Sequence, residues 1–167
     1  YAARPTIRIN GADQERVSAL LLAMEMEEQE DGLSRLELKL SNIASDPQGG
    51  ADYAFEDEKT VKLGDRIAVY AGDETGPQEI FSGRVSALEA GFYVDASPTL
   101  TLLAEDKLQQ ARLKRQTKTH DDATIAGLAR QMAGDLGLTP QISGFNDQIG
   151  TQVQLNESDL AFLRRLL

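Results

Sequence analysis

Residues Leu20 to Ser41 read LLLAMEMEEQEDGLSRLELKLS and carry the clearest structural signal in the chain. In the second half of this stretch, Leu36, Leu38 and Leu40 alternate with charged residues. Such alternation is typical of a β-strand that buries one of its faces. We therefore predict a strand that contributes three leucines to a hydrophobic core.

The first half of the stretch also repeats with a period of two. One face is predicted to hold Leu20, Leu22, Met24 and Met26, and the other Leu21, Ala23, Glu25 and Glu27. These residue types favour helices, but the alternation fits a helix poorly. Asp31-Gly32 lies between the two runs and is a typical hairpin turn. The two runs are therefore expected to pair as an antiparallel hairpin.

Further alternating or apolar runs lie on both sides of this hairpin, separated by turn residues. They cover residues 7–9, 61–71, 79–92 and 99–102. Gly83 is expected to mark a bulge or a bend, and residues 42–54 are predicted to form a loop. Roughly six short strands joined by turns indicate an antiparallel barrel or sandwich. We predict a mainly β chain with one antiparallel β-barrel over residues 5–120.

Helical periodicity replaces the alternation after residue 120. The apolar stripe of a first helix is Ile125, Leu128, Ala129, Met132 and Leu136. Asp121 or Asp122 is expected to cap its start, and Gly137 to supply the left-handed residue at its end. A second helix is expected to begin at Asn156, with Asp159 completing a variant capping box.

The chain stops at Leu167, inside the apolar second helix. We therefore expect the native protein to continue beyond this residue. Residues 121–167 are interpreted as a short helical segment that begins a second, truncated domain.

The composition indicates a globular protein and excludes several classes of site. Hydrophobic residues make up 41% of the 167 residues and charged residues 26%. The chain has no cysteine, which excludes disulfides, thiolate metal sites and cysteine nucleophiles. No apolar run approaches the ~20 residues of a membrane helix. The net charge of −10 disfavours binding to nucleic acid phosphates, and no sequence-specific nucleic acid binding is expected.

The candidate catalytic and metal sites are weak. His120, the only histidine, precedes Asp121 and Asp122, but consecutive side chains rarely converge on one ion, and a pre-helix loop is the favoured interpretation. Acidic residues at 46–58 match no calcium loop. No phosphate-binding glycine motif or serine elbow is present. We expect no catalytic residue, no cofactor and no metal, and hence no enzyme.

Four segments together resemble the phage late control protein D family. They are FSGRV at residues 81–85, LQQARLKR at 108–115, IAGLARQMAGDLGL at 125–138 and QLNESDLAFLRRLL at 154–167. The resemblance covers essentially the whole chain and rests on the order and spacing of these segments. The family is related to the N-terminal part of Vgr spike proteins of type VI secretion.

This resemblance implies a structural baseplate hub of a contractile phage tail or related injection machine. Such a hub is a trimer of subunits with two tube-like barrels each, and it joins a hexameric tail tube to a trimeric spike. The implied partners are therefore copies of the full-length protein, a tube protein and a spike protein. The implied location is the virion tail baseplate, assembled in the bacterial cytoplasm. Two alternatives stay open: a Vgr-type spike and a tail-associated cell-wall hydrolase.

Two charged clusters are candidate functional surfaces. The acidic cluster is Glu25, Glu27, Glu28, Glu30 and Asp31, and the basic stretch is Lys107, Arg112, Lys114, Arg115 and Lys118. An acidic lumen would let DNA pass without binding it, although a solvated strand end that deters aggregation is the favoured interpretation. The basic stretch has no aromatic residue for stacking on bases, so a subunit contact is favoured over DNA.

Overall fold

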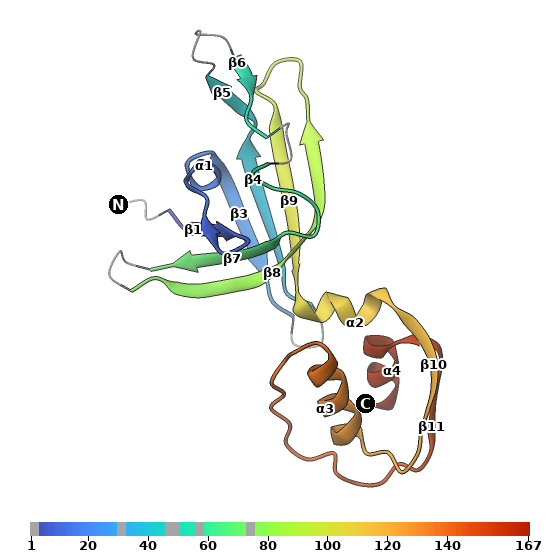
Figure 1. Cartoon of the computed structure of the whole chain (residues 1–167). Helices are drawn as coiled ribbons and strands as arrows, with labels where there is room; N and C mark the ends of the chain where they lie inside the picture. Colours follow the sequence, from blue (N-terminus) through green and yellow to red (C-terminus); the bar gives the residue numbers. More distant parts are fainter. Residues whose placement is uncertain (1–3, 30–32, 46–50, 56–58, 73–75) are drawn as a thin grey trace. The chain divides into compact units, whose positions relative to one another are not determined.

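The computed structural model describes residues 4–29, 33–45, 51–55, 59–72 and 76–167. The chain divides into two compact units, Tyr1–Asp106 (unit 1) and Lys107–Leu167 (unit 2), and each is considered by itself (Figure 1). This division falls after Asp106, whereas the boundary drawn from the sequence lay after His120. None of the helices in the described part is long and apolar enough to cross a membrane.

Unit 1 is built mainly from strands. Its elements are β1 (Thr6–Ile9), β2 (Ala12–Asp13), α1 (Glu15–Ala19), β3 (Leu21–Glu27), β4 (Arg35–Ser41), β5 (Ile43–Ser45), β6 (Ala51–Tyr53), β7 (Arg66–Ala71), β8 (Gln78–Gly91) and β9 (Thr99–Asp106). Seven of these strands form one sheet in the order β2-β1-β7-β8-β9-β4-β3. All of its pairs are antiparallel. The predicted mainly antiparallel β fold is therefore confirmed.

The core of unit 1 follows from the alternation in its strands. Leu36, Leu38 and Leu40 are fully buried, while the residues between them are exposed. Opposite them on β9, Leu100, Leu102 and Ala104 are buried as well. The remaining core residues are Ile7, Ile9, Val17, Val61, Ile67, Val69, Phe81 and Val85. Strands β1, β4, β7, β8 and β9 thus each give one face to a single core, as a sheet with one solvated face requires.

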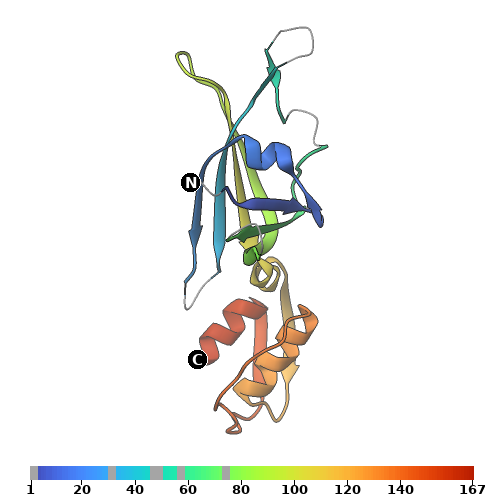
Figure 2. The same cartoon turned by 90° about the vertical axis from the view of Figure 1, so that its left-hand side faces the viewer.

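The sheet does not close into a barrel within the described residues. Its end strands, β2 and β3, pair on one side each and not with each other. The chain passes from β2 to β3 through α1 (Figure 2). Val17 of this helix is fully buried in the core. The helix therefore covers core surface where a closed barrel would have a strand pair. The predicted hairpin of β3 and β4 is present, and its turn at Asp31-Gly32 lies outside the described residues.

A bulge in β3 changes the predicted faces of that strand. Leu21 pairs with Leu40 and Ala23 with Lys39, so Leu22 is an extra residue between them. Leu21 therefore shares the core side with Met24 and Met26, and Leu22 is 60% exposed. A β-bulge shifts the alternation by one residue, which explains why the predicted set of Leu20, Leu22, Met24 and Met26 is wrong.

Long strand β8 pairs with β7 through its first half and with β9 through its second half. Its bulges lie near Ile80 and Ser86, where the register shifts. Gly83 lies between them for a different reason: a Cβ there would lie 2.3 Å from the carbonyl oxygen of Glu105. The glycine therefore permits close backbone approach at this point. The predicted loop over residues 42–54 contains the two-stranded β5–β6 hairpin.

Unit 2 combines a two-stranded ladder with three helices and one short 3₁₀ turn, within the residues described. The elements are η1 (Lys107–Gln109), α2 (Gln110–Leu113), β10 (Arg115–His120), α3 (Ile125–Asp135), β11 (Gln152–Ser158) and α4 (Asp159–Leu166). β10 pairs with β11 antiparallel. Its core contains Ala123, Leu128, Met132 and Phe162, and Phe162 is fully buried.

The helix ends differ from those predicted at two points. Thr124, not Asp121 or Asp122, caps α3, because its hydroxyl accepts a 2.9 Å hydrogen bond from the Gly127 amide. Gly137 does end the helix with a φ of 62°, as expected. The second helix begins at Asp159 with Ser158 as its cap. Asn156 lies instead in strand β11.

Candidate assembly surfaces

Strand β3 leaves one edge of the unit 1 sheet unpaired within the described residues. Met24 lies opposite Leu38 and Met26 opposite Leu36, yet the methionines are 36% and 37% exposed while both leucines are buried. The core side of the sheet is therefore only partly covered at this edge. An edge strand with exposed apolar side chains is a natural site for pairing with another chain.

The acidic cluster predicted from the sequence lies at the end of this edge strand. Glu25 and Glu28 are exposed, and Glu25 lies directly opposite Glu37 on β4. Glu27 is half-buried and forms a 2.6 Å ion pair with Arg35. Glu30 and Asp31 lie outside the described residues. The described members therefore combine two solvated carboxylates with one that stabilises the hairpin.

A row of opposite charges crosses the outer face of the sheet beside this cluster. Glu27, Arg35, Glu105 and Arg84 lie directly opposite one another on β3, β4, β9 and β8. Cross-strand pairs of opposite charge stabilise a sheet and fix its register. This row was not apparent from the sequence, because its members are far apart along the chain.

The other end of the outer face carries a shallow depression of about 390 Å³, lined by residues of β1, β7 and β8. Arg8 borders it, with its guanidinium 4.4 Å from the Tyr70 ring centroid. A 2.6 Å contact joins Arg8 to Asp13, and this hydrogen bond raises the pKa of the arginine. The charge of Arg8 is thus already compensated by Asp13.

The basic stretch lies in unit 2, but its members do not form one continuous cationic site. Lys107 donates a 3.0 Å hydrogen bond to the Gly137 carbonyl, next to the end of α3. Arg115 donates to the Asn156 carbonyl at 3.5 Å. Arg112, Lys114 and Lys118 are exposed. Lys107 and Arg115 therefore have contacts that stabilise the unit.

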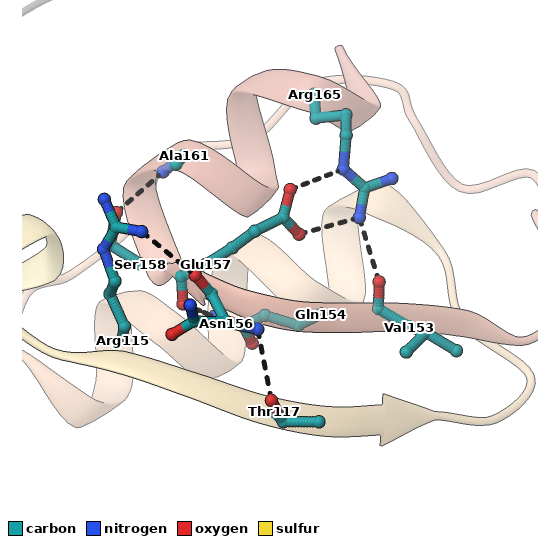
Figure 3. A network of polar contacts seen from close by, with 9 residues as sticks. All are labelled: Arg115, Thr117, Val153, Gln154, Asn156, Glu157, Ser158, Ala161 and Arg165. Carbon is teal, nitrogen blue, oxygen red and sulfur yellow. Dashed lines mark hydrogen bonds and ion pairs between the residues drawn. The ribbon is translucent and has the colours of Figure 1, made fainter.

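Figure 3 shows a network of polar contacts at the junction of β11 and α4, in the NESD segment that carried the family resemblance. Asn156 adopts a φ of 50°, and its amide donates to the Thr117 hydroxyl at 3.1 Å. Gln154 is buried, and its side-chain amide nitrogen donates to the Glu157 backbone carbonyl at 3.0 Å and to the Asp159 carboxylate at 2.9 Å. These bonds fix the sharp change of direction from strand to helix.

Arg165 links α4 back to the same strand. Its Nε and Nη2 atoms lie 2.9 Å from the two carboxylate oxygens of Glu157, and Nη2 also donates to the Val153 carbonyl at 3.0 Å. The hydrogen bond from Arg165 lowers the pKa of Glu157 and raises the pKa of Arg165. Bidentate pairs of this kind have a fixed geometry. The arrangement suits a structural joint between the strand and the helix.

His120 belongs to the core of unit 2 rather than to a pre-helix loop. It ends β10, is 9% exposed and stacks on Phe162 with ring centroids 5.2 Å apart. Asp121 and Asp122 are exposed, and Asp121 accepts a hydrogen bond from Thr151. The three residues do not converge. Over the described ranges, no group of three or more His, Cys, Asp or Glu residues could hold a metal ion.

One family model matches nearly the whole chain. Residues 3–166 match the family model described as the Alg8 N-terminal domain. The chain belongs to the Alg8 N-terminal domain family. Late control protein D, the family named from the sequence, is therefore not the family whose model matches here. A search of curated proteins found no match.

Solved structures place this Alg8 N-terminal domain chain in a fold shared with phage tail proteins. It matches the 43 kDa tail protein of prophage MuSo2 from Shewanella oneidensis with a TM-score of 0.73 and 12% identity, over 99% of this chain and 47% of that one. It matches the E. coli c3393 protein, a type VI secretion component with structural similarity to T4 tail proteins gp27 and gp5, with a TM-score of 0.63 and 15% identity, over 96% and 42%.

A tail protein from Neisseria meningitidis MC58 matches with a TM-score of 0.58 and 12% identity, over 95% of this chain and 43% of that one. The chain thus spans less than half the length of each of these three proteins. At identities this low the likeness shows a common fold. The sequence also predicted a fold of the kind found in phage tail proteins and related secretion proteins.

Proposed function

We propose that this chain is part of a structural component of a contractile tail or related injection machine, with the role of baseplate hub. One observation carries the proposal: both units together match the fold of two tail proteins and a type VI secretion component. The protein then acts through assembly rather than catalysis, in the tail baseplate. Its proposed partners are two further copies of the full-length protein, a tube protein and a spike protein.

The free edge of β3 supports a role in subunit contact. Leu22, Met24 and Met26 are exposed along this edge, and no described strand pairs with it. An adjacent copy in a ring can pair with the strand and cover its methionines. In this proposal the open sheet is completed by neighbours, which is why a single copy needs no closed barrel.

The charged surfaces have proposed places in the same assembly. Glu25 and Glu28 are solvated, and Glu25 faces another carboxylate across the strands. In a ring they fit a lumen that repels DNA phosphates, and alternatively a strand end that deters unwanted pairing. The exposed Arg112, Lys114 and Lys118 fit a contact with an acidic subunit surface, which a chain of net charge −10 offers.

Complementation of a tail-producing strain that lacks this gene tests the proposal. The full-length gene is supplied unchanged, with Met24→Lys and Met26→Lys together, or with Leu63→Lys as the control. Leu63 is 62% exposed and lies off the edge strand. Lysines at the edge should abolish assembled tails in electron micrographs, because charged edge residues block pairing. Normal tails from the double variant, or none from the Leu63 control, would contradict the edge role.

The type VI secretion neighbour favours one alternative, a Vgr-type spike with the same fold in a different machine. A β-helical needle encoded after this region in the full gene would decide for it. A tail-associated cell-wall hydrolase is the other alternative. Loss of turbidity of a peptidoglycan suspension with the purified chain would support the hydrolase, and the proposed hub predicts none.

A further inference from the structure

The β5–β6 hairpin and the β8–β9 connection lie at the same end of unit 1 (Figures 1 and 2), and both carry exposed apolar side chains. On the β8–β9 connection, Phe92 is 66%, Tyr93 55% and Val94 100% exposed. On β6, Tyr53 is 45% exposed. These four residues are named the aromatic tip. Clustered exposed aromatic residues are unusual on a surface that faces only water, and they mark interaction sites.

Contacts among its residues hold the aromatic tip in one arrangement. The rings of Tyr53 and Phe92 meet edge to face, with centroids 5.8 Å apart and planes at 85°. The ring of Tyr93 lies over Gly91, where an added Cβ would be 2.7 Å from the tyrosine hydroxyl oxygen. The three aromatic residues of the tip are thus preorganised, which lowers the entropy lost when a partner binds.

Asn42 joins the two hairpins that carry the tip. Its backbone amide donates to the Pro98 carbonyl at 2.9 Å, on the β8–β9 connection. Its side-chain oxygen accepts a 3.0 Å hydrogen bond from the Phe55 amide, just after β6. Asn42 is 6% exposed, so these bonds lie in the protein interior. It is a positioning residue for the tip.

The charged residues in the segments that carry the aromatic tip are acidic, and one cation lies beside them, since the Arg16 guanidinium is 5.9 Å from the Phe55 ring centroid. Asp52, Glu89 and Asp95 are exposed, and they are the charged residues among the described positions 43–45, 51–55 and 88–100. A surface that binds this tip by charge complementarity must therefore be basic around an apolar pocket. Anionic lipid and a second tip of the same kind would both be repelled.

The tip lies at one end of strand β9 within unit 1. Strand β8 runs toward the tip and β9 runs away from it, ending at Asp106 where unit 1 ends. The tip is therefore at the opposite end of β9 from the connection to unit 2. The β3 edge is made by other residues, so both surfaces can be occupied at once.

We propose that the aromatic tip is an anchor that inserts into a neighbouring protein of a different kind, in an apolar pocket rimmed by lysine or arginine. Phe92 and Val94 enter the pocket, while Asp52 and Asp95 face the basic rim. Asn42 and the Tyr53–Phe92 contact position the side chains of the anchor before the partner binds. The inference goes beyond the proposed hub function, because it requires no ring and no particular oligomeric state.

Site-specific photocrosslinking of the full-length protein, in the cells that make its natural assembly, tests the anchor. p-Benzoyl-phenylalanine replaces Val94, or, in the control, Leu63, another exposed apolar residue of the same unit. We expect position 94 to crosslink to one other polypeptide, at a peptide with both apolar residues and lysine or arginine. Position 63 should not reach that polypeptide. Unchanged melting temperatures establish that each variant is folded.

Charge reversal distinguishes specific binding of the aromatic tip from nonspecific crosslinking. Asp52→Lys with Asp95→Lys should reduce the position 94 crosslink about tenfold, since charge-paired contacts at a docking site are commonly worth that much. Crosslinks to a second copy of the chain or to lipid would overturn the proposal. An unchanged yield after charge reversal, or no crosslink from folded protein, would overturn it as well. Each of these results leaves the hub proposal standing, because that proposal is tested through the β3 edge.

Discussion

The guanidinium of Arg165 binds both carboxylate oxygens of Glu157, with two contacts of 2.9 Å, and so joins α4 to the end of β11. The same arginine donates to the Val153 carbonyl and lies 5.2 Å from the Phe162 ring centroid. One side chain therefore connects the strand, the helix and the edge of the core. The pair is solvent-exposed, so its contribution to stability is small and depends on the ionisation of Glu157.

Acid should weaken unit 2 through this pair. Because Arg165 lowers the pKa of Glu157 below its ordinary value of 4.5, the stabilisation is fully present above that pH. It is lost as pH falls through the lower, folded-state pKa. Melting temperatures of the wild type and of Glu157→Gln should therefore differ at pH 7 and converge in the acid range. A constant difference across the whole range would show that Glu157 acts without its charge.

Phe162→Ala should strongly destabilise unit 2. The ring is fully buried and stacks on His120, so its removal leaves a cavity and exposes core surface. Loss of a buried phenylalanine costs about 3–5 kcal/mol, measurable by urea denaturation followed by circular dichroism. Leu167→Ala is the control, because that side chain is 71% exposed. Equal stability of the two variants would rule out the central place of Phe162.

Gly83→Ala should disrupt the pairing of β8 with β9. The new Cβ would lie 2.3 Å from the Glu105 carbonyl oxygen, which is backbone and cannot move away alone. We expect a loss of about 2 kcal/mol or more, as for other overpacked buried sites. Gly134→Ala is the matched control, since nothing lies within 4 Å of its Cβ and alanine favours a helix. Amide exchange at residues 99–106 should rise only in the first variant.

Thr124→Ala should shorten or fray α3. Its hydroxyl satisfies the free amide of Gly127 at the helix start, and loss of such a cap costs about 1 kcal/mol. Chemical denaturation measures the change, with exposed Gln131→Ala in the same helix as the control. If Thr124→Ala leaves stability unchanged, another residue must cap the helix, as the sequence had suggested for Asp121 or Asp122.

The elements that could be predicted are those with a regular hydrophobic period, such as strand β4 and helix α3. Leu36 to Leu40 alternate without interruption, and the structure buries all three leucines. Strand β11 was missed because its pattern is inverted: Gln154 is buried, while Val153 and Leu155 are 48% and 69% exposed. Hydrogen bonds to Glu157 and Asp159 satisfy the buried amide, so burial here follows polar partners and not hydropathy.

Features that depend on residues far apart in the chain could not be predicted from the sequence. The bulge at Leu22 has no compositional signal, because one extra residue in a strand changes only the register. The acidic and basic clusters could be found as runs of charge, but their partners could not. Glu27 pairs with Arg35 across a hairpin, and Phe92 meets Tyr53 from another hairpin. Such contacts depend on how the sheet folds.

The mass of the full-length protein in solution, measured by light scattering beside this chain of 167 residues, tests the hub proposal most directly. The account predicts a trimer for the full-length protein, which the Met24→Lys and Met26→Lys double variant converts to a folded monomer. A full-length protein that stays monomeric at all concentrations, and whose mass does not respond to the edge variant, would contradict the proposed assembly through β3.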